Sequence, residues 1–84
     1  MYYGWFDDNP KLAVELKIQD AIDAYVRRFG KRPNVVLVNE ADVAEIAGMV
    51  VRAESFIRRH NFWVGWEDAA RAVPMGAGKA AAAA

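Results

Sequence analysis

Apolar residues recur with helical spacing between positions 8 and 29, and this is the longest periodic pattern in the chain. They are separated by three or four positions, the spacing that places side chains on one face of a helix. The residues on this face are Val14, Ile18, Ala21, Ile22, Tyr25 and Phe29. The pattern predicts an amphipathic helix over residues 8–29. We expect its main anchors in the core to be Ile18, Ile22, Tyr25 and Phe29.

Both ends of this helix carry residues that are common at helix ends. Asp7, Asp8 and Asn9 have side chains that accept hydrogen bonds from the first free N–H groups of a helix. Pro10 fits a first helical position, where an N–H group is not needed. Gly30 can adopt the left-handed conformation in which many helices end. We therefore expect these polar residues to cap the start and Gly30 to form the end.

Two runs of strand-forming residues flank the predicted helix. Tyr2–Phe6 is rich in aromatic residues, which favour strands. Residues 35–38, Val-Val-Leu-Val, have no polar alternation, which is typical of a strand buried on both faces. The simplest arrangement is a right-handed β-α-β unit with parallel strands. The same pattern also allows another strand to lie between these two.

The residues after the second strand predict a short helix. Asn39 can cap a helix that begins with Glu40, and Gly48 can end it after about two turns. Its acidic residues Glu40, Asp42 and Glu45 are expected to face water.

The rest of the chain predicts two strands and a short C-terminal helix. Residues 49–57 alternate polar and apolar side chains, and residues 62–66 resume the pattern, as half-exposed strands do. A turn at 58–61 would join them as an antiparallel hairpin. Residues 67–73 predict a final helix that Pro74 ends. The Gly- and Ala-rich segment 74–84 has no core-forming residues and is interpreted as a disordered or artefactual tail.

These elements predict one domain over residues 1–73, of the α+β class or a small α/β fold. The expected order is β-α-β-α-β-β, with the long helix packed on a mixed sheet of three to four strands.

Composition and charge limit the classes of function. The 84 residues include 11 basic and 11 acidic side chains, so the formal net charge is zero and no general field for polyanions is present. The absence of cysteine excludes a disulfide framework and a thiolate metal site. No apolar run reaches the roughly 20 residues that cross a bilayer, and the N-terminus is unlike a signal peptide. We expect a soluble, cytoplasmic protein that binds no membrane.

No catalytic, metal-binding or cofactor-binding arrangement can be assembled from the sequence. Residues 76–79, Gly-Ala-Gly-Lys, match only the end of a phosphate-binding loop, because Val73 and Ala80 replace residues that such a loop requires. His60 is the only histidine, and with no cysteine it cannot build a typical zinc site. We therefore expect no enzyme activity, no metal, no cofactor and no small-molecule substrate.

Basic residues form two groups in the sequence. One group lies at the end of the long helix and the other in the predicted hairpin turn. Their members are Arg27, Arg28, Lys31 and Arg32 in the first, and Arg58, Arg59 and His60 in the second. If the two groups meet in space, they form a positive patch that binds phosphates, with aromatic residues nearby for base stacking. This gives the alternative function, a nucleic-acid-binding accessory protein.

The strands carry more aromatic side chains than one long helix can cover. Successive side chains of a strand point to opposite faces, so large rings must emerge on both sides of the sheet. An exposed aromatic patch of this kind usually marks an interface. We take Tyr3, Trp5 and Trp63 as candidate interface residues. The leading hypothesis is a non-enzymatic protein-interaction module, which is either self-associating or a small subunit of a larger assembly.

Overall fold

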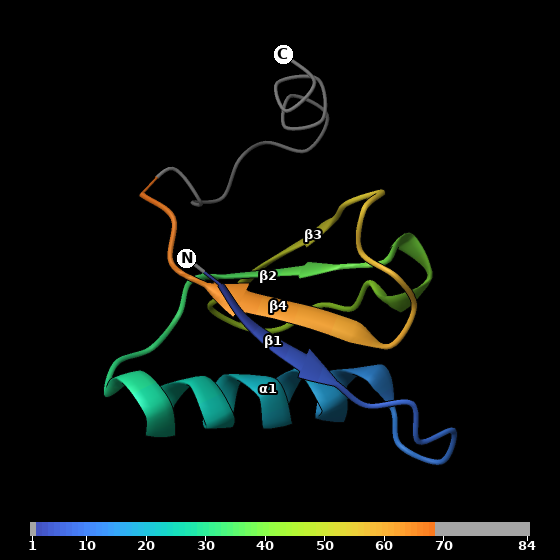
Figure 1. The fold of residues 1–84 in the computed structure, drawn as a ribbon, viewed down its shortest axis with the longest axis horizontal. Coiled ribbons are helices and arrows are strands. Elements are labelled where there is room, and N and C mark those ends of the chain that lie inside the picture. Colours follow the sequence, from blue (N-terminus) through green and yellow to red (C-terminus); the bar gives the residue numbers. More distant parts are fainter. Residues whose placement is uncertain (1, 69–84) are drawn as a thin grey trace.

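One helix packs against a four-stranded sheet in the computed structural model, which describes residues 2–68 (Figure 1). In chain order the elements are β1 (Tyr2–Phe6), α1 (Val14–Phe29), β2 (Val35–Val38), the 3-10 turn η1 (Glu40–Asp42), β3 (Val50–Ala53) and β4 (Asn61–Gly65). The sheet contains parallel and antiparallel pairs. The described part of the chain is therefore a small α+β fold.

β4 lies inside the sheet, between β1 and β2, so the strand order is β1-β4-β2-β3. It runs antiparallel to both neighbours, and its Phe62 stands opposite Trp5 of β1 and Val38 of β2. β1 and β2 are consequently parallel to each other but separated, which is the second of the two arrangements that the sequence allows. β3 pairs in parallel with the other side of β2.

The predicted hairpin between residues 49–57 and 62–66 is wrong. β2 separates β3 from β4, so the chain between them crosses the sheet instead of turning back on itself. Ile57, in this connection, is buried against Val35 and Leu37 of β2. A tight hairpin would not bring Ile57 onto β2, and burying a side chain of this size contributes about 1.5–3 kcal/mol.

α1 covers one face of the sheet, which we call the helix side (Figure 1). The core on this side is formed by Ile18, Ala21, Ile22 and Tyr25 of α1 with Val36, Val38, Phe62 and Val64 of the strands. α1 itself contacts β1 and β4. Ala44, Ile46 and Met49, from the connection between β2 and β3, pack against the same core.

The second predicted helix is also wrong, because between β2 and β3 only the short turn η1 forms. Asn39 does act as a cap, since its side chain accepts a hydrogen bond of 2.8 Å from the N–H of Ala41. The chain then becomes extended at Val43. It turns back through Gly48, whose φ is 75°. An extended segment places Ala44 and Ile46, two positions apart, on the same core.

The start of α1 differs from the prediction, because the helix begins at Val14. The polar side chains before it stabilise turns instead of capping the helix. The N–H of Asn9 donates to Asp7 Oδ1 at 3.0 Å, and the N–H of Lys11 donates to Asn9 Oδ1 at 2.9 Å. Asp and Asn stabilise such turns as readily as they cap helices. The N-cap is Ala13, which has no side-chain cap hydrogen bond.

The end of α1 is as predicted. Gly30 has a φ of 77°, and its N–H donates to the carbonyl oxygen of Val26 at 2.8 Å. Phe29, however, is not a core anchor, because its ring is exposed. It lies at the edge of the core, with its centroid 4.6 Å from that of Tyr25 and 5.9 Å from that of Tyr3.

The predicted helix over 67–73 falls mostly outside the described residues, and the tail over 74–84 lies wholly outside them. Within residues 2–68, the single α-helix, α1, is neither long enough nor apolar enough to cross a membrane.

Truncation of Ile22 to alanine is expected to lower the free energy of unfolding by about 2–5 kcal/mol, because this side chain of α1 is fully buried against the sheet. Leu16→Ala is the matched control, since Leu16 lies on the same helix and is 53% exposed. Its truncation should cost no more than about 0.5 kcal/mol. Denaturant melts measure both values, and equal losses would mean that the buried face of α1 is wrongly assigned.

Candidate functional site

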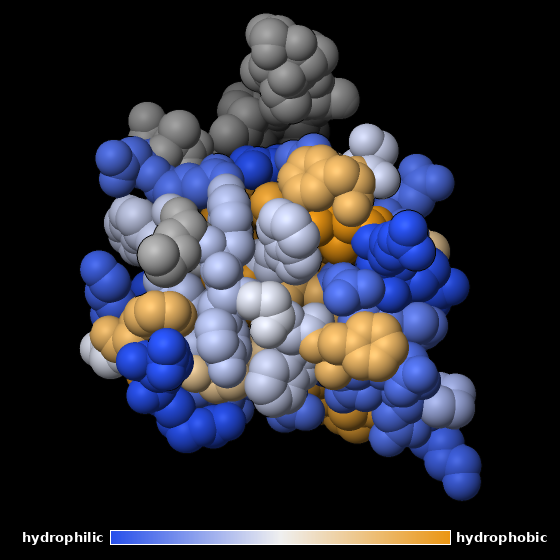
Figure 2. All heavy atoms as spheres, viewed as in Figure 1, coloured by the Kyte–Doolittle hydropathy of each residue, from blue (hydrophilic) through white to orange (hydrophobic). Residues whose placement is uncertain are grey.

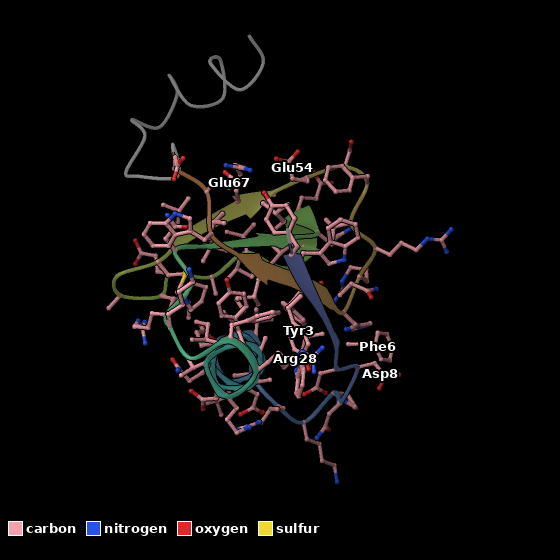
Figure 3. All side chains as sticks on the ribbon, turned by 60° about the vertical axis from the view of Figure 1, so that its left-hand side comes forward. Tyr3, Phe6, Asp8, Arg28, Glu54 and Glu67 are labelled. Atoms are coloured by element: carbon pink, nitrogen blue, oxygen red, sulfur yellow. The ribbon has the colours of Figure 1, made fainter. Side chains whose placement is uncertain are left out.

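The face of the sheet opposite α1 has no helix over it within residues 2–68, and we call it the open face. Strand alternation and register place on this face Tyr2, Gly4 and Phe6 of β1, Asn61, Trp63 and Gly65 of β4, Val35 and Leu37 of β2, and Val50 and Arg52 of β3. Figure 3, which looks roughly along α1, shows Glu54 and Glu67 on this side of the sheet and Tyr3 and Arg28 on the helix side.

Three aromatic rings meet on the open face, and we call them the aromatic cluster. Trp63 lies in the middle, with its ring centroid 6.2 Å from that of Tyr2 and 5.5 Å from that of Phe56. Phe56 is 59% exposed and Trp63 is 37% exposed. Phe6, on the same face of β1, is 60% exposed. Figure 2 shows weakly polar and hydrophobic side chains over β1 and its neighbours, with hydrophilic side chains around them.

The connection from β3 to β4 holds Phe56 in this position. Ile57, the next residue, is buried against the sheet, and its carbonyl oxygen accepts a hydrogen bond of 3.0 Å from the side-chain amide of Asn39. The N–H of Ile57 donates to the carbonyl oxygen of Glu54. Because Ile57 points into the protein and its backbone is bonded, Phe56 is held outward at the surface.

A network of charged side chains borders the aromatic cluster. Arg52 donates two hydrogen bonds of 3.0 and 2.9 Å to the carboxylate of Glu67, and its Nε donates to Glu54 at 2.9 Å. The hydroxyl of Tyr2 also donates to Glu67. Asn34 fixes the backbone of Glu67 through two hydrogen bonds of 2.7 and 2.8 Å. The network thus joins β1, β3 and the residues after β4, and it leaves one net negative charge at this border.

The predicted interface residues do not lie on one surface. Trp63 is on the open face, but Tyr3 and Trp5 point to the helix side, where they pack half-buried against the core. The cause is the register, because Trp5 stands opposite Phe62 and so has the opposite phase to Trp63. The indole Nε1 of Trp5 is buried without a hydrogen-bond partner among the described residues.

The predicted basic residues do not form one patch either. Arg27 and Arg28 lie in the last turn of α1, and Lys31 and Arg32 follow between α1 and β2, near the end of β4. Arg58, Arg59 and His60 precede the start of β4. The two groups are therefore at opposite ends of the sheet (Figure 1). The structure separates residues that the nucleic-acid hypothesis requires to be together.

Arg59 has a structural partner, the carboxylate of Asp42. Two guanidinium nitrogens of Arg59 donate to Asp42 at 3.1 to 3.3 Å, and the N–H of His60 donates to it at 2.9 Å. Asp42 is only 1% exposed, so the expectation that it faces water is wrong. A buried carboxylate needs such partners, since an unpaired buried charge is very costly.

The surroundings of Asp42 lower its pKa. Burial alone raises the pKa of this carboxyl. The hydrogen bond from the His60 N–H, the hydrogen bond from Arg59 and the positive charge of Arg59 act in the other direction and outweigh burial. The arrangement also holds His60 at a φ of 67°, a left-handed conformation that is uncommon for residues other than glycine.

Several residues of the open face could not be identified as such from the sequence. Arg52 and Glu54 do share a face, as their spacing predicts, but the contact of Arg52 with Glu67 spans 15 positions and has no local signal. Phe56 was counted only as part of an expected strand. Tyr2 belongs to the aromatic run of β1, but its phase could not be assigned before the register of β4 was known.

Comparisons with protein-family models, with curated proteins and with solved structures found no match for this chain. Over residues 2–68, no three His, Cys, Asp or Glu side chains are grouped as metal ligands would be. The function is therefore inferred from the surface of the protein alone.

Acidification is expected to destabilise the protein through Asp42, because the pKa of this group is lower in the folded state. As the pH falls through about 4, unfolded chains take up a proton on this residue before folded chains do. The stabilisation is complete above that range and is lost as the pH falls through the lower folded-state pKa. Denaturant melts between about pH 6 and pH 2 measure the loss.

Two variants separate Asp42 from the other carboxyl groups. Asp42→Asn is expected to be less stable at neutral pH and to lose less stability on acidification than the unmutated protein. Asp20→Asn, which changes an exposed carboxyl of α1, should keep the original pH dependence. If Asp42→Asn loses as much stability on acidification as the unmutated protein, the lowered pKa is not the cause.

Proposed function

We propose that this protein is a non-enzymatic interaction module that binds another protein surface through the open face. The observation that carries the proposal is the exposure of Phe6, Phe56 and Trp63 on one face of the sheet. Burying apolar area contributes about 25 cal/mol per Å². A partner that covers these rings therefore gains free energy that water does not provide.

The composition and shape of the site support this function. Aromatic residues are enriched in the centres of protein interfaces, and polar residues surround them. The aromatic cluster has this arrangement, because Arg52, Glu54 and Glu67 form a hydrogen-bonded border beside it. Its rings are also held in place before binding, since Trp63 is on a strand inside the sheet and Phe56 is fixed by Ile57. A pre-organised surface loses less conformational entropy when it binds.

A second copy of the chain is the first partner to test. The formal net charge is zero, so two copies approach without long-range repulsion. A two-fold contact would place each aromatic cluster against the other and bury both at once. A place as a small subunit in a larger assembly uses the same face.

The double variant Phe56→Ser with Trp63→Ser is expected to weaken self-association at least tenfold, because it removes two exposed rings from the open face. Sedimentation equilibrium or light scattering over a range of concentrations measures the dissociation constant. Leu16→Ser is the matched control, since it removes an exposed apolar side chain from α1, on the other side of the molecule. It should leave the association unchanged.

A thermal or denaturant melt of each variant separates an interface from a core. Phe56→Ser is expected to keep nearly all the stability of the unmutated protein, because its ring is mostly in water. The proposal fails if the unmutated protein stays a monomer at its highest soluble concentration, and if Phe56→Ser and the double variant each lose as much stability as Ile22→Ala.

A further inference from the structure

A second surface, distinct from the open face, lies along the free edge of β3. Within residues 2–68 this strand is the last in the sheet order and has β2 on one side only. The N–H of Val50 donates to Asn34, and the N–H of Glu54 donates to Val38, so these alternate residues face β2. In an extended strand the N–H and C=O of one residue point to the same side. The intervening residues, Val51 and Ala53, therefore direct their backbone groups away from the sheet.

The outward backbone groups of β3 have no hydrogen-bond partner among residues 2–68. Val51 and Ala53 stand beside β2 in the register, but their own backbone groups point away from it, and neither residue forms another hydrogen bond there. Two N–H and two C=O groups thus lie along one line without a partner in the described part of the chain. Only another extended backbone has donors and acceptors at the matching spacing.

A shallow groove lies directly beside this edge on the helix side. It has a volume of about 520 Å³ and is lined by residues 43–47, Met49 and Val51. Val51 is therefore both an edge residue and part of the groove wall. A residue that pairs with Val51 on an added strand would point its side chain to the same side of the sheet, toward the groove.

The charge of the groove indicates which charged side chain an added strand would carry beside the side chain that enters the groove. Glu45 is the only charged residue in the lining, and it forms no ion pair with the described residues. Arg52, the one charged residue of β3, points to the open face and is neutralised by Glu54 and Glu67. The edge therefore attracts a basic residue and does not repel an approaching strand.

We infer that the edge of β3 binds an extended peptide segment of a partner protein by adding it to the sheet as a fifth strand. The segment carries an aliphatic side chain, which enters the groove, and a neighbouring Lys or Arg, which lies near Glu45. Backbone pairing with Val51 and Ala53 supplies hydrogen bonds that do not depend on the peptide's sequence. The groove and Glu45 contact its side chains and so select the sequence. This site goes beyond the proposed function, because it shares none of the exposed rings of the open face.

The other free edge of the sheet, on β1, lacks this combination. The N–H of Asp7 donates to His60, so by alternation Tyr2, Gly4 and Phe6 direct their backbone groups outward there. Gly4 offers no side chain at the middle of that edge, and the groove described above lies at the opposite side of the sheet. β3 is therefore the edge with both backbone groups and a place for a side chain.

A display library of random decapeptides, selected on the full chain, tests the site. Enriched peptides are expected to share an aliphatic residue next to a basic one. A synthetic peptide of the most enriched sequence is then titrated into the protein while backbone amide resonances are followed. The amides of Val51, Ala53 and residues 43–49 should shift together and saturate, and hydrogen exchange at Val51 and Ala53 should slow at least tenfold.

Two pairs of variants locate the contact. Ala53→Pro removes an outward N–H and is expected to lower the affinity for the synthetic peptide at least tenfold. Ala53→Ser keeps the N–H and should bind the peptide normally. Ala47→Trp fills the groove and should weaken binding to a similar degree. Ala41→Trp places the same ring at an exposed position outside the groove and should have no effect. The Ala47 pair keeps the test valid if Ala53→Pro does not fold.

Several results would overturn this inference. One is that no peptide is enriched, and another is that the enriched peptide binds Ala53→Pro and Ala47→Trp as tightly as the unmutated protein. A dimer that Ala53→Pro dissociates would show that a second copy occupies the edge instead. The double variant Phe56→Ser with Trp63→Ser should bind the peptide normally, so the outcome is independent of the open face.

Discussion

The burial of Phe62 and Val64 beneath α1 determines which face of the sheet each of the remaining strand residues points to. Both side chains are completely buried, and both stand on the strand that lies between β1 and β2. Because side chains alternate, turning Phe62 and Val64 toward the helix turns Trp63 away from it. The register then gives Tyr3 and Trp5 the helix side and leaves Tyr2 and Phe6 on the open face. A single packing contact thus separates the aromatic residues into a core set and a surface set.

Features that depend on neighbouring residues could be predicted from the sequence. The spacing of Ile18, Ile22 and Tyr25 identified the buried face of α1, and the apolar run of β2 identified a strand buried on both faces. Gly30 marked the end of the helix, because few other residues adopt its backbone conformation easily.

Features that depend on the position of β4 could not be predicted. A central strand that comes late in the sequence changes the neighbours of β1, β2 and β3 at once. The start of α1 was missed for a different reason, since Asp7 and Asn9 can stabilise a turn or cap a helix with the same side-chain atoms. Asp42 looked like a surface acid because its partner Arg59 comes 17 positions later. Of the three candidate interface residues, Trp63 alone lies on the open face, and its neighbours Phe56 and Tyr2 reach it only in the folded chain.

The late position of β4 in the sequence also orders the events of folding. As the chain leaves the ribosome, α1 can form from contacts between near neighbours, whereas β1 and β2 have no strand between them until residue 61 and beyond have emerged. Tyr2 must then find Gly65, a partner more than sixty positions away. Contacts of such long separation form slowly because of the entropy of closing the intervening loop. The nascent chain can therefore pair β2 with β3 early, but β1 has no partner strand until residues 61–65 have emerged.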